Sequence, residues 1–188
     1  MQSWQAVALV FGQVLIGATF AASALGKVRD PDGFARAAAA FRLIPPGRVP
    51  LVARLLAAAE ALVVALLVVG LLVVGVVPAA GVAATAGLGL AVALLVAYTI
   101  GLISVRVRGM AVTCHCFGAS PMLVSWWDVV RNVLLVGGAG WGLAAGDPAP
   151  RLPAGDGVLV AMTALGAALI VTNLSNVVNT AVHVAGAE

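Results

Sequence analysis

Long apolar runs, interrupted at only a few places, dominate the pattern of hydrophobic and polar positions along the chain. Runs of about 20 apolar residues match a helix that crosses a bilayer, whereas barrel strands would alternate over about 10 residues. The runs here do not alternate and are rich in Ala, Leu, Val and Gly. The pattern therefore predicts an all-α integral membrane protein. We expect a bundle of five transmembrane helices over approximately residues 5–26, 51–75, 79–103, 125–145 and 157–180.

The polar segments divide this single membrane domain, residues 1–188, into its spans. The longest polar connection, residues 27–50, follows the first span, and its centre at 32–42 predicts a short amphipathic surface helix. Only residues 76–78 separate the second and third spans, so we expect these two to form a tight hairpin. A second polar connection, residues 104–124, precedes the fourth span.

The fourth span carries two further local patterns. Ser125 and Asp128 have the spacing of a capping box, which predicts a helix start at this point. Gly138, Gly142 and Gly146 recur every four residues, and such a small-residue face allows another helix to approach closely.

Composition agrees with the pattern and adds an orientation. The chain is 63% hydrophobic and only 9% charged, whereas soluble domains are about half apolar and a quarter charged. The lipid bilayer is therefore the expected surroundings. The net charge of +3 does not indicate nucleic-acid binding, because the basic residues lie beside the spans as topology signals. Nine of the ten basic residues flank one side and only Arg151 the other, which predicts a multi-pass cell-membrane protein with an outside N-terminus and a cytoplasmic 104–124 loop.

The two cysteines of the chain form a Cys-His-Cys cluster in this loop, with His115 between Cys114 and Cys116. Two thiols separated by one residue can close a small, strained disulfide, and strained exposed disulfides exchange readily. Arg106, Arg108 and a protonated His115 would favour the nucleophilic thiolate. Two alternatives stay open. The same three side chains suit a soft metal such as copper, zinc or mercury, and the cysteines can also be inert apolar residues.

Two sets of polar residues inside the spans are further candidates. Glu60 is the one ionisable residue deep inside a span, which makes it a functional candidate or a hydrogen-bonded packing residue. We expect its carboxylate to face the bundle interior and to pair with Lys27 or with an asparagine stripe. That stripe, with Asn173, Asn176 and His183, lies on one face of the fifth span. It indicates either interhelical hydrogen bonds or a polar lining for a cofactor head group or proton path.

Several of these residues belong to a pattern that resembles a known family over approximately residues 10–140. The first half resembles the opening of the DoxX-like and MauE membrane proteins in the residues Gly26-Lys27, Asp30-Pro31, Phe34 and Glu60. The second half resembles the methylamine utilisation protein family MauE in the residues Cys114-His115-Cys116-Phe117-Gly118, Asp128 and Arg131-Asn132.

The resemblance implies a membrane thiol–disulfide oxidoreductase that acts with a thioredoxin-fold partner in the maturation of other proteins. Cys114 and Cys116 would then be the redox pair. The candidate supporting residues are Lys27, Glu60, His115, Arg131 and Asn132, together with Asn173 and Asn176, which the periodicity of the fifth span indicates and which lie outside the resemblance. By analogy with other membrane thiol oxidases, electrons would pass to a membrane quinone, although no quinone motif is visible. The resemblance does not extend to methylamine metabolism itself, because the wider family serves other pathways.

Other functions remain compatible with the sequence. A soft-metal binding or transport protein would use Cys114, His115 and Cys116 as ligands, and a non-catalytic assembly subunit would use the loop only to dock a partner. The predicted orientation also conflicts with a role in maturing exported proteins, which requires cysteines that can be reached from outside. The sequence does not set the direction of electron flow, the client or the oligomeric state.

Overall fold

The structure is a computed structural model that describes residues 2–72, 79–110, 112, 124–144 and 153–173. All regular elements in these segments are helices. They are α1 (Gln2–Arg29), α2 (Pro31–Ala40), the 3₁₀ helix η1 (Pro46–Arg48), α3 (Val49–Leu72), α4 (Ala79–Val107), α5 (Trp126–Ala144) and α6 (Ala154–Thr172). This confirms the predicted all-α membrane fold with a short helix after the first span.

Four of the described helices are long and apolar enough to cross a membrane, namely those over Trp4–Arg29, Pro46–Leu72, Gly81–Val107 and Gly155–Thr172. The fifth long helix, α5, is less apolar because polar residues occupy its first two turns. It nevertheless packs against α4 and α1 as a full member of the bundle.

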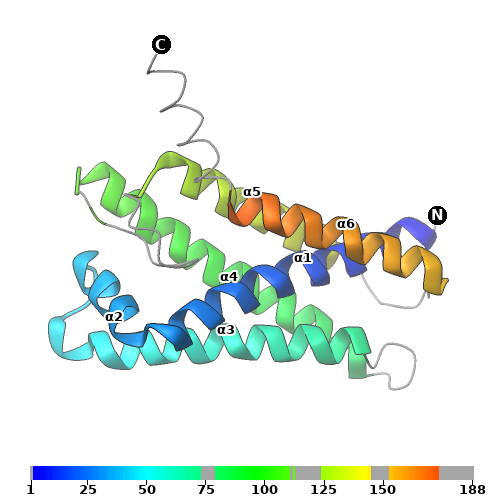
Figure 1. Cartoon of the computed structure of the whole chain (residues 1–188), viewed down its shortest axis with the longest axis horizontal. Coiled ribbons are helices and arrows are strands. Elements are labelled where there is room, and N and C mark those ends of the chain that lie inside the picture. The colour runs from blue at the N-terminus through cyan, green and yellow to red at the C-terminus, as the bar shows by residue number, and fades with distance from the viewer. Residues whose placement is uncertain (1, 73–78, 111, 113–123, 145–152, 174–188) are drawn as a thin grey trace, which may run out of the picture.

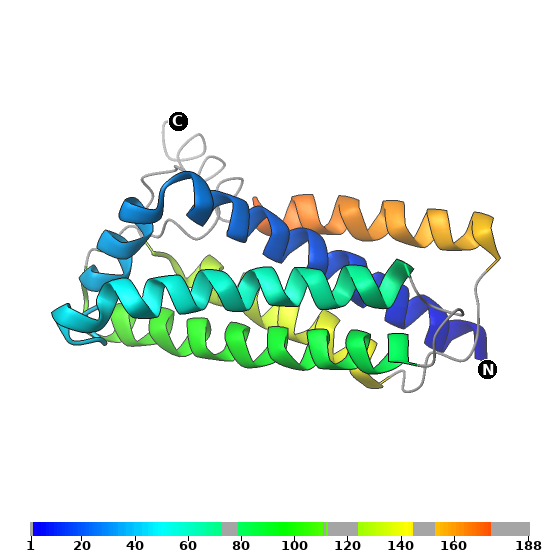
Figure 2. The same ribbon diagram turned by 90° about the horizontal axis from the view of Figure 1, so that it is seen from below.

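The long helices follow one another in alternating directions, with α1 at the centre (Figures 1 and 2). Helix α1 packs against α3, α5 and α6, while α4 packs against both α3 and α5. Helix α6 lies on the outer side of α1. Because α1 and α4 end where α3 and α5 begin, these four termini share one end of the bundle with α2, which we call the α2 end.

Close contact between α1 and α5 depends on glycines. A Cβ atom on Gly12 would lie 3.1 Å from the Gly138 carbonyl oxygen and 3.3 Å from the Gly142 Cα, so only glycine fits there without a shift of backbone. A Cβ atom on Gly138 would lie 2.8 Å from a methyl group of Leu15. The prediction that Gly138 and Gly142 allow close helix approach is confirmed, whereas Gly146 lies outside the described residues.

The short surface helix α2 begins at a well-defined cap. The Asp30 carboxylate accepts a hydrogen bond from the Gly33 backbone N–H at 2.8 Å, and Pro31 occupies the first turn, where its missing N–H costs nothing. A Cβ atom on Gly33 would lie 1.9 Å from the Asp30 carboxylate, which explains the glycine. The cap fixes the direction of α2, so that Phe34 on its inner face is buried.

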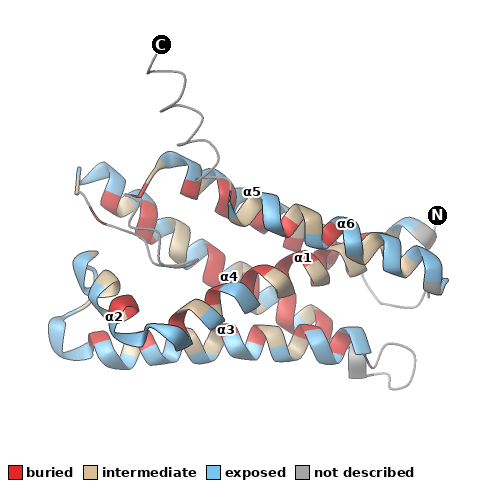
Figure 3. Ribbon diagram, viewed as in Figure 1, coloured by how far each residue is buried: buried red, intermediate tan, exposed pale blue. Residues whose placement is uncertain are grey.

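Burial divides the bundle into a central region and a lipid-facing surface (Figure 3). Leu55, Leu62 and Val69 recur every seven residues on α3 and are each about half exposed. Helix α6 exposes Leu159, Met162 and several other apolar residues in the same way. A continuous exposed apolar surface of this kind is stable only in lipid.

Candidate functional site

A buried ion pair joins α1 to α3 near the α2 end. The Lys27 ammonium lies 2.8 Å from each oxygen of the Glu60 carboxylate and donates a further hydrogen bond to the Ser23 hydroxyl at 2.7 Å. Lys27 is 3% exposed and Glu60 is completely buried. The prediction that Glu60 faces the bundle interior and pairs with Lys27 is confirmed. Ser23 stands one helical turn before Lys27, which puts both side chains on the same face of α1.

Tyr98 of α4 extends this cluster to a third helix. Its hydroxyl donates a hydrogen bond to Glu60 Oε1 at 2.6 Å. The Lys27 ammonium also lies over the Phe34 ring at 4.7 Å and over the Tyr98 ring at 5.7 Å, so two aromatic faces add to its stabilisation. Sequence reasoning missed Tyr98. It is the only tyrosine of the chain and falls inside a predicted span, and this could have marked it.

The first turns of α5 bring a second buried ion pair to the same region. Arg131 lies 3.3 Å from the Asp128 carboxylate, and both side chains are at least nine-tenths buried. Asp128 also accepts a hydrogen bond from the Ser125 backbone N–H at 2.8 Å, which confirms the predicted capping-box contact. Asn132, 3% exposed, follows Arg131 on the buried face of α5. Residues Asp128, Arg131, Asn132 and Leu135 share that face because they are spaced three and four apart.

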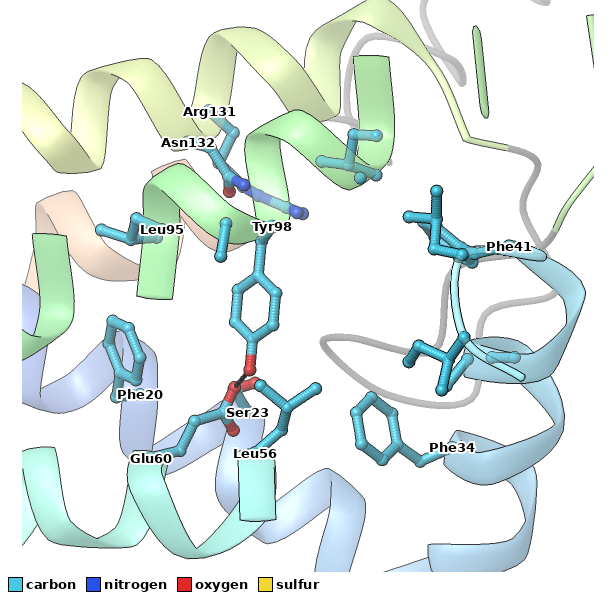
Figure 4. A pocket seen from close by; sticks show the side chains of 17 residues that line it. Phe20, Ser23, Phe34, Phe41, Leu56, Glu60, Leu95, Tyr98, Arg131 and Asn132 are labelled. Atoms are coloured by element: carbon cyan, nitrogen blue, oxygen red, sulfur yellow. Dashed lines mark hydrogen bonds between the residues drawn. The ribbon is translucent and has the colours of Figure 1, made fainter. Parts of the chain in front are cut away.

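These groups border a cavity of about 260 Å³ between α1, α2, α3, α4 and α5 (Figure 4). Its polar lining comes from five residues, Ser23, Glu60, Tyr98, Arg131 and Asn132. The other lining residues are apolar and include Phe20, Phe34, Phe41, Leu43, Leu56 and Leu95. Figure 4 shows Tyr98 reaching toward Glu60, with Phe34 of α2 and Phe41, which follows α2, on another side of the cavity.

The connection that holds the cysteines leaves the bundle at this same end. Helix α4 ends at Val107, and the chain turns at Gly109, whose φ of 65° is readily accessible to glycine. The Met110 N–H donates a hydrogen bond back to the Val105 carbonyl. Beyond this cap, the Val124 N–H donates to the Val112 carbonyl at 2.9 Å, and both valines are buried. The two ends of the intervening segment are therefore joined to each other at the α2 end.

Cys114, His115 and Cys116 themselves lie outside the described residues, and so does the alternative metal site that they would form. Among the residues that the structure does describe, no group of three His, Cys, Asp or Glu side chains could hold a metal ion. Of the asparagine stripe, the structure describes only Asn173, and this residue does not line the cavity. Asn173 is exposed at the end of α6 and donates to its own helix at Leu169, while Asn176 also lies outside the described residues.

Exposed arginines surround the α2 end. Seven of them are exposed near the ends of the helices that meet there, Arg29, Arg36, Arg42, Arg48, Arg54, Arg106 and Arg108. The Arg106 guanidinium lies 5.8 Å from the Trp126 ring, a contact that connects the end of α4 to the start of α5. Arg108 is hydrogen-bonded to Ser104.

Taken together, the fold and site define a multi-pass α-helical membrane protein with two buried ion pairs and an apolar cavity at one end of its bundle. The family model described as methylamine utilisation protein MauE matches residues 5–145, about three quarters of the chain. The chain therefore belongs to the MauE family. The match spans α1 to α5 and ends before α6 begins. No curated protein and no solved structure gave a significant match.

Proposed function

We propose that this MauE-family protein is a membrane thiol–disulfide exchange component in which Cys114 and Cys116 are the redox pair. The observation that carries the proposal is the Cys-His-Cys sequence inside the family match, on a segment whose flanking residues Val112 and Val124 are hydrogen-bonded to each other. Cys114 follows Val112 by two residues, a reach of at most about 7 Å even for extended chain.

The proposed exchange uses a thioredoxin-fold partner. A partner thiolate attacks one sulfur of the Cys114–Cys116 disulfide, forms a mixed disulfide and releases the other cysteine as a thiolate. A second thiolate of the partner then attacks the mixed disulfide, which leaves the partner with a disulfide and Cys114 and Cys116 as two thiols. Arg106 and Arg108, both exposed at the end of α4, supply positive charge that favours thiolates near the pair.

The buried groups have a supporting role in this proposal. Lys27, Glu60 and Tyr98 connect α1, α3 and α4, and Arg131 with Asp128 orders the first turns of α5. The helix ends that flank the cysteine segment, those of α4 and α5, thus belong to an ordered part of the bundle. Rigid support of a reactive group favours a defined geometry of attack.

We further propose that the α2 end faces the cytoplasm of the cell. The seven exposed arginines at this end support that orientation, because basic residues collect on the cytoplasmic side of membrane proteins. A partner would then meet the cysteines from the cytoplasm. Labelling of Cys114 and Cys116 in intact cells with a membrane-impermeant thiol reagent tests the side, and rapid labelling would overturn this orientation.

The exchange itself is tested by trapping. Cys114→Ser and Cys116→Ser variants are isolated from native membranes and run on non-reducing gels, since removal of the resolving cysteine leaves the partner covalently attached. We expect one of the two variants to give a reductant-sensitive adduct with a thioredoxin-fold protein. If neither does, and the purified wild-type protein instead contains stoichiometric copper or zinc that Cys114→Ser loses, the proposal is wrong and the metal function replaces it.

A further inference from the structure

The cavity at the α2 end has the features of a small-molecule site. Its walls are mostly apolar, with a few polar groups brought together from four helices, as is typical of ligand pockets. At about 260 Å³ it is slightly below the roughly 300–1,000 Å³ of sites for drug-sized ligands. A single substituted ring fits this size, and a long chain does not.

The charges around the cavity exclude an ionic ligand. Glu60 and Arg131 are the charged residues among its described lining, and each is already paired, Glu60 with Lys27 and Arg131 with Asp128. The net charge of these four groups is zero. An anion or a cation would bring an uncompensated charge into an apolar site or break one of the two pairs, and both are costly. The ligand is therefore uncharged.

Asn132 indicates which polar group the ligand carries. Its side chain is 97% buried and lines the cavity, yet it makes no hydrogen bond to another described residue. A buried amide without a partner is unfavourable, and its NH₂ group can donate two hydrogen bonds. The adjacent Arg131 guanidinium carries donors only. This part of the wall suits a ligand oxygen that accepts hydrogen bonds, such as a carbonyl.

The remaining walls suit a flat ring. Phe20, Phe34, Phe41 and Tyr98 all line the cavity, and aromatic side chains pack well against planar rings. An uncharged planar ring with carbonyl oxygens, soluble in the apolar phase that surrounds the bundle, is a quinone. We infer that the cavity binds the ring of a lipid-soluble quinone, with the Asn132 amide donating to one ring carbonyl and the quinone tail remaining outside.

The use of this ligand, although not its binding, rests on the proposed function. When the Cys114 and Cys116 thiols form a disulfide, one S–S bond is made and two electrons and two protons are released. A quinone takes up both electrons and both protons on its two oxygens and becomes a quinol. Dithiol and quinone therefore give disulfide and quinol in a balanced reaction.

Binding is tested on the purified full chain in detergent by titration calorimetry with decylubiquinone, a short-chain quinone. We expect one saturable site. Asn132→Leu should weaken binding about tenfold, the equivalent of one buried hydrogen bond. Asn173→Leu is the matched control. Asn173 is exposed at the end of α6 and, among the described residues, its side chain bonds only to Leu169 and Thr172, so the affinity of this variant should equal that of the wild type.

A cavity-filling variant keeps the inference testable if Asn132→Leu folds poorly. A Cβ atom on Gly101 would lie 3.7–3.8 Å from Phe41 and Leu43, an ordinary contact, so Gly101→Leu fills the cavity without a backbone clash. We expect this variant to melt no lower than the wild type and to lose quinone binding. Full binding by Gly101→Leu, or equal binding by a well-folded Asn132→Leu, would overturn the inference.

Two further measurements distinguish an uncharged ligand from a charged one, and quinone binding from the proposed thiol–disulfide function. Tighter binding of decanoate, a carboxylate with a tail of similar length, would overturn the argument for an uncharged ligand. The Cys114→Ser/Cys116→Ser double variant should bind decylubiquinone with unchanged affinity. If the quinone binds but the reduced wild-type protein does not convert it to quinol, the binding site stands and the redox function fails. Absence of saturable binding, even with partner trapping intact, refutes the quinone site alone.

Discussion

Helix α1 is held to its neighbours in two different ways in its two halves. Near the α2 end, Lys27 reaches across to Glu60 of α3, and side chains span the distance between the helices. In the other half, Gly12 lies against Gly138 and Gly142 of α5, and the two backbones themselves are in contact. The first arrangement depends on buried charges and the second on the absence of side chains.

The difference explains why the cavity occurs where it does. Backbones that meet through glycines leave no room for a ligand, and packing there is determined by shape alone. Long polar side chains keep two helices further apart. Space then remains between the helices wherever neighbouring side chains are too short to fill it. In this protein α2 covers that space without filling it. The polar contact is thus compatible with a ligand cavity, whereas the glycine contact only holds α1 and α5 together.

The largest expected effect is at the polar contact. Lys27→Met leaves the fully buried Glu60 carboxylate without its cationic partner and should destabilise the protein by about 3–5 kcal/mol. Unfolding in mixed detergent and dodecyl sulfate micelles, followed by circular dichroism, measures this. Arg29→Met is the control, because Arg29 is exposed two residues away and should lose little.

A double variant sharpens this test. Lys27→Met/Glu60→Met removes both charges and replaces them with apolar side chains of similar volume, so most of the stability should return. If the double variant is as unstable as the single one, packing around Lys27 rather than its charge pairing is what matters.

The glycine contact should show a smaller but clear effect. Gly12→Leu forces α1 away from the α5 backbone and should cost about 1–3 kcal/mol, as overpacking usually does. Gly137→Leu is the matched control on α5, because a Cβ atom there meets nothing within 4 Å. The same unfolding assay applies. Equal stability of the two variants would show that α1 and α5 can separate freely.

The smallest expected effect belongs to Tyr98→Phe. This change removes the hydrogen bond to Glu60 but keeps the ring that lies near Lys27. Because Glu60 retains both contacts to Lys27, we expect a loss of about 1 kcal/mol, close to the values for hydrogen bonds between membrane helices. A loss as large as that of Lys27→Met would mean that Tyr98, rather than Lys27, is the main partner of Glu60.

Much of the fold could be predicted because a bilayer imposes a strong constraint on sequence. Hydrophobic length alone indicated the long helices, and the capping pattern at Ser125 and Asp128 marked the start of α5 despite its polar first turns. The Lys27–Glu60 pair could also be predicted, because alternating spans put both residues in the same half of the membrane and a lone buried carboxylate needs a partner.

The site was less predictable, for reasons that lie in its geometry. The cavity depends on how far Phe41 and Leu43 reach toward Gly101, which no pattern in the sequence encodes. Asn173 shows the limit of a periodic pattern. The pattern predicts that Asn173 and Asn176 share a face of the last span, but Asn176 lies outside the described residues, and among the described residues Asn173 bonds to Leu169 and Thr172 of its own helix. Periodicity predicts which residues share a face, and it does not predict which side chains lie opposite that face.

The separation of Lys27 and Glu60 by 33 residues also has a consequence for how the protein is made. At about 5–20 residues per second, a ribosome synthesises Lys27 at least a second or two before Glu60. During that interval the lysine has no carboxylate partner. Its place near the end of α1 lets the ammonium remain among the lipid head groups until α3 is inserted. Docking of α1 onto α3 through this ion pair can therefore occur only after α3 has been synthesised.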